Sequence, residues 1–133
     1  MIAVDTNVLI RLLMQDEMKQ GAAAKSLFAS QPIWIARTVL LEANWVLRSL
    51  YGFSESAIVE AFTNLLGLPN VHTEDKPAMA TAFAISAAGV ELADAIHLTS
   101  RPPGAKFVSF DRSFVRRAQR PGVSEISVVE TRH

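Results

Sequence analysis

Short apolar segments alternate with longer helix-like segments along most of this chain, and this alternation limits the folds open to it. Several of the helix-like segments begin at a Ser, Thr or Asp and end near a Gly. Short apolar strands separated by helices are typical of an α/β fold with a parallel sheet. We therefore predict a three-layer α/β sandwich with a short, mostly parallel central sheet flanked by helices. The predicted strands are 2–4, 32–35, 71–73, 106–110 and 126–129.

The predicted helices fill the gaps between these strands. A chain of 133 residues fits one domain with its own core, so residues 1–133 are predicted to form a single domain. The first four helices have candidate capping residues, namely Thr6, Asp16, Thr38 and Ser54. The helices are expected at 6–13, 16–30, 38–51, 54–66, 76–88, 92–100 and 113–119.

Composition limits the compartment and the partners only broadly. The chain has 13 basic and 13 acidic residues, so its net charge indicates no partner. It has no cysteine, its N-terminus lacks a signal-like segment, and its longest uncharged stretch, 77–90, is too short to span a membrane. A cytoplasmic protein with no membrane contact is expected. The hydrophobic share of 50% favours either a second buried surface, such as a homodimer interface, or an alanine-rich helical interior.

Four acidic residues stand in apolar surroundings in the sequence. Asp5 and Asp111 each close an apolar run, whereas Glu42 and Asp94 sit inside apolar helical segments. Carboxylates in such surroundings are costly unless a cation neutralises them. Because the carboxyl ends of parallel strands gather at one crevice, acids that are distant in sequence can meet there.

A cluster of such acids favours a divalent cation. Two carboxylates about 4 Å apart repel each other by roughly 4 kcal/mol at an effective dielectric constant of ~20. Oxygen ligands without cysteine or an obvious histidine set indicate a hard cation, Mg²⁺ or Mn²⁺. Such an ion polarises phosphoryl oxygens and activates water, which suits phosphodiester hydrolysis. Arg112, Arg116 and Arg117 follow one of the acids and are candidates to hold a nucleic-acid backbone.

Each acid also has a simpler interpretation. Asp5 or Thr6 alone could cap a helix, Asp111 could cap the next one, and Asp94 could be an N-cap or first-turn acid. His97 lies three residues after Asp94, on the same helical face, and is either a second metal ligand or a hydrogen-bonded structural residue.

Glu42 has its own simpler interpretation. Leu40, Leu41 and the apolar residues 45–47 surround it in sequence, so it could form a buried salt bridge. Arg37 and Arg48 are the candidate partners for that bridge.

Other reaction types fit the sequence less well. It has no glycine-rich phosphate loop, no Gly-x-Ser-x-Gly motif and no cysteine nucleophile. A haloacid-dehalogenase-like phosphatase would need a second aspartate two residues after Asp5, where Asn7 stands. A response-regulator receiver would need a mid-chain phosphoacceptor aspartate at a strand end, and none lies between 43 and 70.

The order and spacing of the acidic motifs resemble a known family. Asp5-Thr6-Asn7 directly after an N-terminal strand, Glu42, Ala93-Asp94-Ala95 and Ser109-Phe110-Asp111 are similar to the motifs of the PIN domain. The resemblance is to the toxin ribonucleases of VapBC toxin–antitoxin systems. It spans the chain from Ile2 to about Val129.

This resemblance implies a Mg²⁺-dependent endoribonuclease that acts on single-stranded or looped RNA. Asp5 and Asp94 would be the main metal ligands, Glu42 would bind the metal or orient the attacking water, and Asp111 would complete the acidic site. Some relatives carry a further acid where this chain has Arg112. The number of bound metal ions, one or two, is therefore left open. A homodimer and a cognate antitoxin that blocks the site are also implied. The residues expected to support the ligands from just outside the coordination sphere are Thr6, Asn7 and Ser109.

Two alternatives remain at this point. A non-catalytic module of the same fold would use its basic segment to bind RNA or an apolar groove to bind protein. A DNA-directed or flap nuclease is less favoured, because the chain is short for the elements that would thread a flap. The sequence does not select an RNA target.

Overall fold

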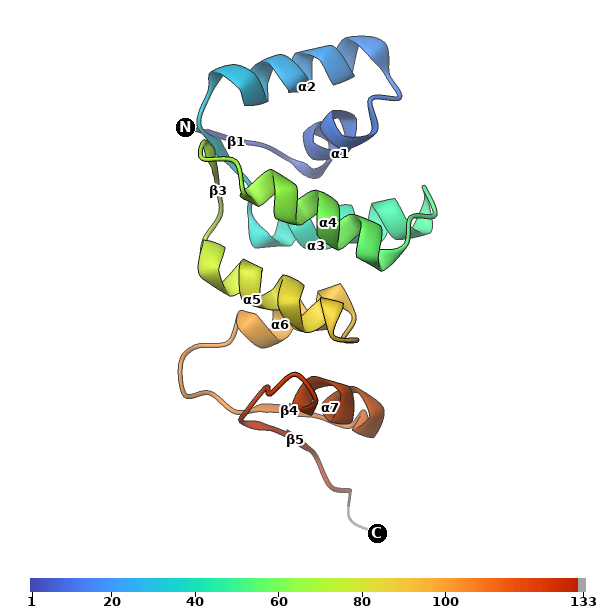
Figure 1. The fold of residues 1–133 in the computed structure, drawn as a ribbon, viewed down its shortest axis with the longest axis vertical. Coiled ribbons are helices and arrows are strands. Elements are labelled where there is room, and N and C mark those ends of the chain that lie inside the picture. Colours follow the sequence, from blue (N-terminus) through green and yellow to red (C-terminus); the bar gives the residue numbers. More distant parts are fainter. Residues whose placement is uncertain (132–133) are drawn as a thin grey trace. The chain divides into compact units, whose positions relative to one another are not determined.

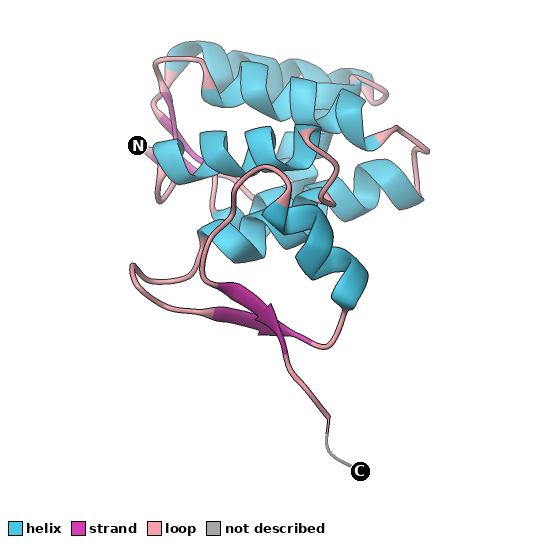
Figure 2. Ribbon diagram, turned by 60° about the horizontal axis from the view of Figure 1, so that its bottom comes forward, coloured by secondary structure: helices cyan, strands magenta, loops and turns pink. Residues whose placement is uncertain are grey.

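Helices and short strands alternate through residues 1–131, which are the residues that the computed structural model describes (Figure 1). Helix predominates, and each strand spans only two or three residues (Figure 2). The strand pairings among the described residues are all parallel. The predicted α/β class, with helices flanking a short parallel sheet, is confirmed.

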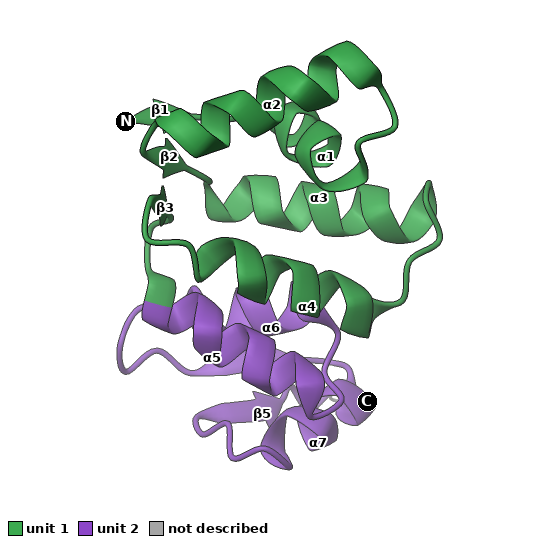
Figure 3. Ribbon diagram, turned by 45° about the horizontal axis from the view of Figure 1, so that its top comes forward, with its two compact units in different colours: residues 1–76 green, residues 77–133 purple. Residues whose placement is uncertain are grey.

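The chain divides into two compact units, Met1–Lys76 and Pro77–His133 (Figure 3). The prediction of one domain over residues 1–133 stays a prediction, and its last two residues lie outside the described part. The helices within residues 1–131 are all too short or too polar to cross a membrane.

The first unit contains a three-stranded sheet. Its strands are β1 (Ile2–Ala3), β2 (Ile33–Trp34) and β3 (Val71–His72), with β2 in the centre. Ile33 pairs with Ile2 on one side and with Val71 on the other. Ile33 and Val71 are fully buried, but both residues of β1, at the edge of this sheet, are exposed. An apolar run at the start of the chain is thus not buried in β1 itself, and of residues 2–4 only Val4, beyond the end of the strand, is buried.

Helices connect the parallel strands, as this strand direction requires. α1 (Thr6–Met14) and α2 (Met18–Ser30) connect β1 to β2, and α3 (Arg37–Ser49) and α4 (Glu55–Leu66) connect β2 to β3. The strands lie at one end of these helices (Figure 3). The large side chains of this unit that lose nearly all solvent contact are Leu9, Ile33, Ile35, Leu40, Ile58, Phe62 and Val71.

The caps of the first two helices differ from those predicted. α1 is capped by Asp5, whose Oδ1 accepts a hydrogen bond from the Val8 N–H at 2.9 Å, so Thr6 is the first helical residue. α2 is capped by Glu17, whose carboxylate accepts backbone N–H groups at the start of the helix. Asp16 cannot serve as that cap because its carboxylate is bound elsewhere.

The starts of the next two helices give one correction and one confirmation. α3 follows Ala36, which has no capping side chain, so the predicted cap Thr38 is wrong. Instead, the N–H of Arg37 donates to Glu74 Oε1 at 2.8 Å. Ser54 caps α4 as predicted, and its Oγ accepts a backbone N–H at 3.2 Å.

The second unit is built from two helices followed by a β-α-β segment. α5 (Lys76–Ala87) begins at the last residue of the first unit, and α6 (Leu92–Thr99) follows it. β4 (Phe107–Ser109), α7 (Arg112–Gln119) and β5 (Ile126–Val128) complete the unit. β4 and β5 pair in parallel, so α7 is the crossover between them. The side chains of this unit with the least solvent contact are Met79, Ala82, Val90, Leu92, Ala95, Ile96 and Ala118.

Candidate functional site

Asp5 lies where β1 leads into α1, and the following helix fixes its carboxylate. One oxygen, Oδ1, caps the helix through the N–H of Val8. The side chain is exposed. Oδ2 makes no hydrogen bond with any residue in 1–131. Capping therefore orients this carboxylate while one oxygen remains accessible to a cation.

Asp111 occupies an equivalent position between β4 and α7. Its Oδ1 accepts from the N–H of Phe114 at 3.0 Å, and its own N–H donates to Ser109 Oγ at 3.0 Å. The rings of Phe107 and Phe114 meet edge to face, with centroids 5.9 Å apart, and join the strand to the helix. The predicted cap is confirmed, and Ser109 holds the backbone of the acid rather than its carboxylate.

Glu42 projects from the solvent-facing side of α3 and is exposed. The two arginines considered as its partners bind other acids. Arg37 lies 3.5 Å from Glu74, and Arg48 lies 3.8 Å from Glu55. The interpretation of Glu42 as one half of a buried salt bridge is therefore wrong.

Asp94 is the third residue of α6 and is half-buried. Burial raises the pKa of this carboxyl group, and the negative charge of Glu91 raises that pKa further. His97 and Arg117 act in the opposite direction and lower the pKa of Asp94, whereas the charge of Asp111 adds to the increase. Asp94 and Asp111 are thus close enough for their charges to interact within the second unit.

The burial of the four acids differs from expectation. Asp5, Glu42 and Asp111 are exposed, and only Asp94 loses much of its solvent contact. The reason is local geometry, because two of the exposed acids sit at helix N-termini. The third, Glu42, points away from the buried positions of α3, which are 40, 43, 44 and 47. Apolar neighbours in sequence did not imply burial of the acid.

The donor chemistry of these acids fits a hard divalent cation, since all four present carboxylate oxygens. Two of them, Asp5 and Glu42, belong to the first unit, and Asp94 and Asp111 belong to the second. Across residues 1–131, no three aspartate, glutamate or histidine side chains form a group that could hold a metal ion. The four acids fit a divalent cation by their oxygen ligands, their charge and their accessibility.

The residues expected to support the acids behave differently from one another. Ser109 is hydrogen-bonded to Asp111, as described above. Thr6 is half-buried and Asn7 is exposed, and within the described chain neither side chain hydrogen-bonds to Asp5. Asn7 instead lines a pocket of about 300 Å³ formed with other residues of α1 and α2.

The three arginines of α7 have distinct surroundings. Arg112 pairs with Glu130 at 2.9 Å on the surface, and Arg116 is exposed. Arg117 is half-buried, and its Nη1 donates to Ser113 Oγ at 3.1 Å. Its Nε is buried without a hydrogen-bond acceptor among the described residues. Arg117 is also the arginine whose charge acts on Asp94.

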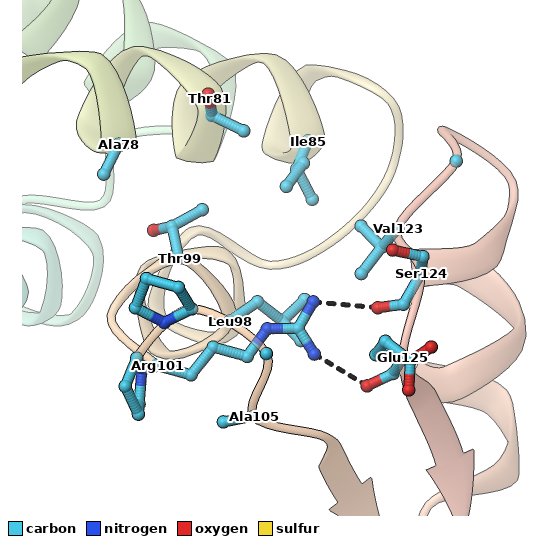
Figure 4. Close-up of a pocket in the computed structure, with 14 residues that line it drawn as sticks. Ala78, Thr81, Ile85, Leu98, Thr99, Arg101, Ala105, Val123, Ser124 and Glu125 are labelled. Carbon is cyan, nitrogen blue, oxygen red and sulfur yellow. Dashed lines mark hydrogen bonds between the residues drawn. The ribbon is translucent and has the colours of Figure 1, made fainter.

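A pocket of about 490 Å³ in the second unit lies apart from these acids, since none of the four lines it. Figure 4 shows Arg101 extending across it toward the backbone at Ser124 and Glu125. Its two terminal nitrogens donate to these carbonyl oxygens at 2.8 and 2.7 Å, respectively. Arg101 is therefore a structural connection between the loop after α6 and the start of β5.

Sequence reasoning missed a polar network in the first unit. Arg11 binds Asp16 at 2.8 Å, and the hydroxyl of Tyr51 donates to the other oxygen of Asp16 at 2.8 Å. The hydrogen bond from Tyr51, then that from Arg11, lowers the pKa of Asp16 despite some desolvation. The available signal was an arginine within the otherwise apolar segment 8–13, which needs a partner. The network ties the turn after α1 to the end of α3.

Asn44 was also missed. It is 3% exposed on the inner face of α3, and its Oδ1 has no hydrogen-bond donor among residues 1–131. The signal was an amide at a position of the helix where the spacing predicts an apolar side chain.

Comparison with known proteins identifies the family. The sequence matches the family model described as the PIN domain over residues 2–120, a range that includes all four acids. No curated protein matches the chain. The helices flanking a short parallel sheet agree with this fold. Because the match covers most of its length, this chain belongs to the PIN domain family, whose members are generally nucleases.

Proposed function

We propose that this protein is a Mg²⁺-dependent endoribonuclease that hydrolyses phosphodiester bonds in RNA. Mn²⁺ would substitute for Mg²⁺. The observation that carries the proposal is the PIN-domain match over residues 2–120, a range that includes Asp5, Glu42, Asp94 and Asp111. Asp5, Glu42, Asp94 and Asp111 together would bind the metal.

The electrostatics of the second unit support this assignment. Asp94 is half-buried and experiences the negative charges of Asp111 and Glu91. An ionised carboxylate in this setting is unfavourable, and a divalent cation would relieve the repulsion.

The proposal assigns a role to each of these side chains. A bound divalent cation supplies Lewis acidity for the phosphodiester and lowers the pKa of water. Asp5 and Asp111 each use one carboxylate oxygen for the helix cap and would offer the other to the cation. Glu42 would orient the attacking water. Arg112, Arg116 and Arg117 would hold the RNA backbone through their positive charges.

The same proposal places the protein as the toxin of a type II toxin–antitoxin system in the cytoplasm. It would form a homodimer and bind a cognate antitoxin that blocks the acidic site. The motif resemblance to VapC-type toxins and the 50% hydrophobic composition support this part. Induced expression of the chain in a heterologous host should arrest growth, and Asp5→Asn should remove the arrest.

Cleavage of RNA by the purified protein tests the central claim. Mixed structured RNAs would be incubated with Mg²⁺, with Mn²⁺ and with chelator, beside Asp5→Asn. Asn is as good an N-cap as Asp, so this variant should fold normally. Metal-dependent cleavage that Asp5→Asn abolishes would support the proposal. Full activity in chelator or in the variant would contradict it.

A second candidate is a non-catalytic PIN-fold module that binds RNA or protein. The basic residues of α7 favour it, because they could contact an RNA backbone without a metal. This alternative predicts RNA binding that survives chelation and no cleavage product with any metal.

A further inference from the structure

Trp45 is an unusual surface residue. Its side chain lies on α3 and is 60% exposed. A single exposed leucine is ordinary, but tryptophan is on average highly buried. The exposed indole therefore offers a large aromatic face on a well-formed helix for contact with another molecule.

The indole lies next to a candidate catalytic acid. Glu42 precedes Trp45 by three residues, so the two side chains are neighbours on one face, with Cβ atoms about 5–6 Å apart. Arg48 follows three residues later, its side chain is 41% exposed, and it forms a 3.8 Å ion pair with Glu55. An acid, an aromatic ring and a cation thus follow each other along the exposed side of α3.

The surroundings of Trp45 favour a nucleic acid over an apolar protein partner. The other exposed positions of this helix are polar, namely Thr38, Glu42, Arg48 and Ser49. The exposed Leu50 lies five residues further on, about 140° around the helix, and so faces another direction. The central part of a protein interface is depleted of charged residues, which this face is not.

Unpaired RNA matches the chemistry of this face. Bases of single-stranded RNA stack on aromatic side chains, and stacking needs no particular base. The guanidinium of Arg48 is complementary to a phosphate. In a paired duplex the base faces are already stacked and cannot cover the indole.

We propose that Trp45 stacks on an unpaired base of the RNA close to the bond that is cut. The inference rests on the proposed function in taking RNA as the ligand. Trp45 is then an RNA-contacting residue that adds affinity for unpaired bases without selecting their identity.

Tryptophan fluorescence tests this contact directly, because the chain has only two tryptophans. The other, Trp34, is half-buried in β2. In an Asp5→Asn background, which prevents cleavage, a short single-stranded RNA should quench the fluorescence, and the same sequence as a duplex should not. Trp45→Phe removes only the exposed indole and should remove the quenching.

Affinity for a labelled single-stranded RNA completes the test. Trp45→Ala should weaken binding by about 5- to 150-fold, the range of a lost base–aromatic stack. Trp45→Phe should retain most of the affinity, because phenylalanine also stacks. Leu50→Ala, which removes an exposed apolar side chain on another side of the helix, should leave binding unchanged.

The outcomes separate this inference from the proposed enzyme. RNA binding that depends on Trp45 without any cleavage would support the stacking contact and contradict the nuclease. In the protein that retains Asp5, Trp45→Ala could cleave RNA with the same KM as wild type. That result would overturn the stacking contact alone. Loss of dimer in Trp45→Ala with unchanged RNA affinity would also overturn it, since the indole would then contact a second copy.

Discussion

Each of the two compact units has one acid at a strand-to-helix junction and one acid on a helix. The helix acids of the two units differ in their exposure to solvent. Asp5 and Asp111 have the same local design, with one carboxylate oxygen bound to an N–H three residues later at 2.9 and 3.0 Å. Glu42, in the first unit, stands exposed on α3 beside Trp45. Asp94, in the second unit, is half-buried beside other charges.

This difference indicates where a cation matters most to the folded state. The exposed carboxylate of Glu42 keeps its hydration when no metal is bound. Asp94 has lost part of its hydration and is repelled by Glu91 and Asp111. Arg117 offsets part of that repulsion. A metal ion should therefore stabilise the acid pair of the second unit more than that of the first.

The largest expected effect is on the rate of RNA cleavage. Loss of the helix acid should slow this rate by a similar factor in either unit. Glu42→Gln and Asp94→Asn should each slow RNA cleavage by roughly 10²-fold or more, because each removes charge that stabilises the reacting complex. Single-turnover cleavage rates at saturating Mg²⁺ give the measurement. Glu60→Gln, an exposed acid on α4, is the matched control. A wild-type rate in Glu42→Gln would remove the first unit's helix acid from the site.

The response of stability to metal should distinguish the units. Mg²⁺ at 100 times its Kd should stabilise the wild-type fold by about 2.7 kcal/mol. Asp94→Asn and Asp111→Asn should lose most of this increase, which thermal unfolding with and without Mg²⁺ measures. Added NaCl at matched ionic strength controls for screening. An equal Mg²⁺ response in wild type and both variants would show that this acid pair does not bind the ion.

The N-caps Asp5 and Asp111 should contribute equally to the free energy of unfolding. Asp5→Ala and Asp111→Ala should each reduce the free energy of unfolding by about 1 kcal/mol, the usual value of a lost N-cap. The corresponding Asn variants should be near neutral, since Asn also accepts the N–H. Urea unfolding in chelator measures both. Asn variants as unstable as the Ala variants would mean that charge, rather than capping, is the main contribution.

The smallest effect concerns the pH dependence contributed by Asp94. Its pKa in the folded chain lies above the ordinary value of 3.8, first because of burial and then because of Glu91. Below 3.8 the carboxyl is neutral in both states and has no effect. As the pH rises past 3.8, the unfolded chain ionises first, so stability is lost until the folded pKa is passed and the loss then stays constant.

Asp94→Asn removes this penalty. Without metal, the variant should be slightly more stable than wild type at pH 7 and equal to it near pH 3. Urea unfolding in chelator at the two pH values measures the difference, and Glu91→Gln should show a smaller change of the same sign. A variant less stable than wild type at pH 7 would indicate that the attraction to Arg117 outweighs desolvation.

Features that depend on nearby residues were accessible to sequence reasoning. The predicted strands match β1 to β5 to within two residues at each end, because each is a short apolar run bounded by polar residues. The cap at Asp111 was predicted correctly, since a capping bond spans only three residues. Where two adjacent residues were both good caps, as at Asp5 and Thr6, the sequence did not decide between them, and the structure selects Asp5.

Features that depend on distant residues were not accessible. Arg37 and Glu74 are 37 residues apart, and the Tyr51–Asp16 bond spans 35. No spacing rule connects such residues, so Glu42 was given partners that bind other acids. Helix rotation was also decisive, because it placed Glu42 and Trp45 on the exposed side of α3 and Asn44 on the buried side.

The sequence by itself determined the α/β class, the order of helices and strands, and membership of the PIN domain family, because each depends on local spacing and residue type. Only the tertiary structure decided how much water each acid retains, which arginine acts on Asp94 and which aromatic side chain stands exposed beside Glu42. Solvation and charge interactions depend on how whole elements pack, and packing brings together residues that no local pattern connects.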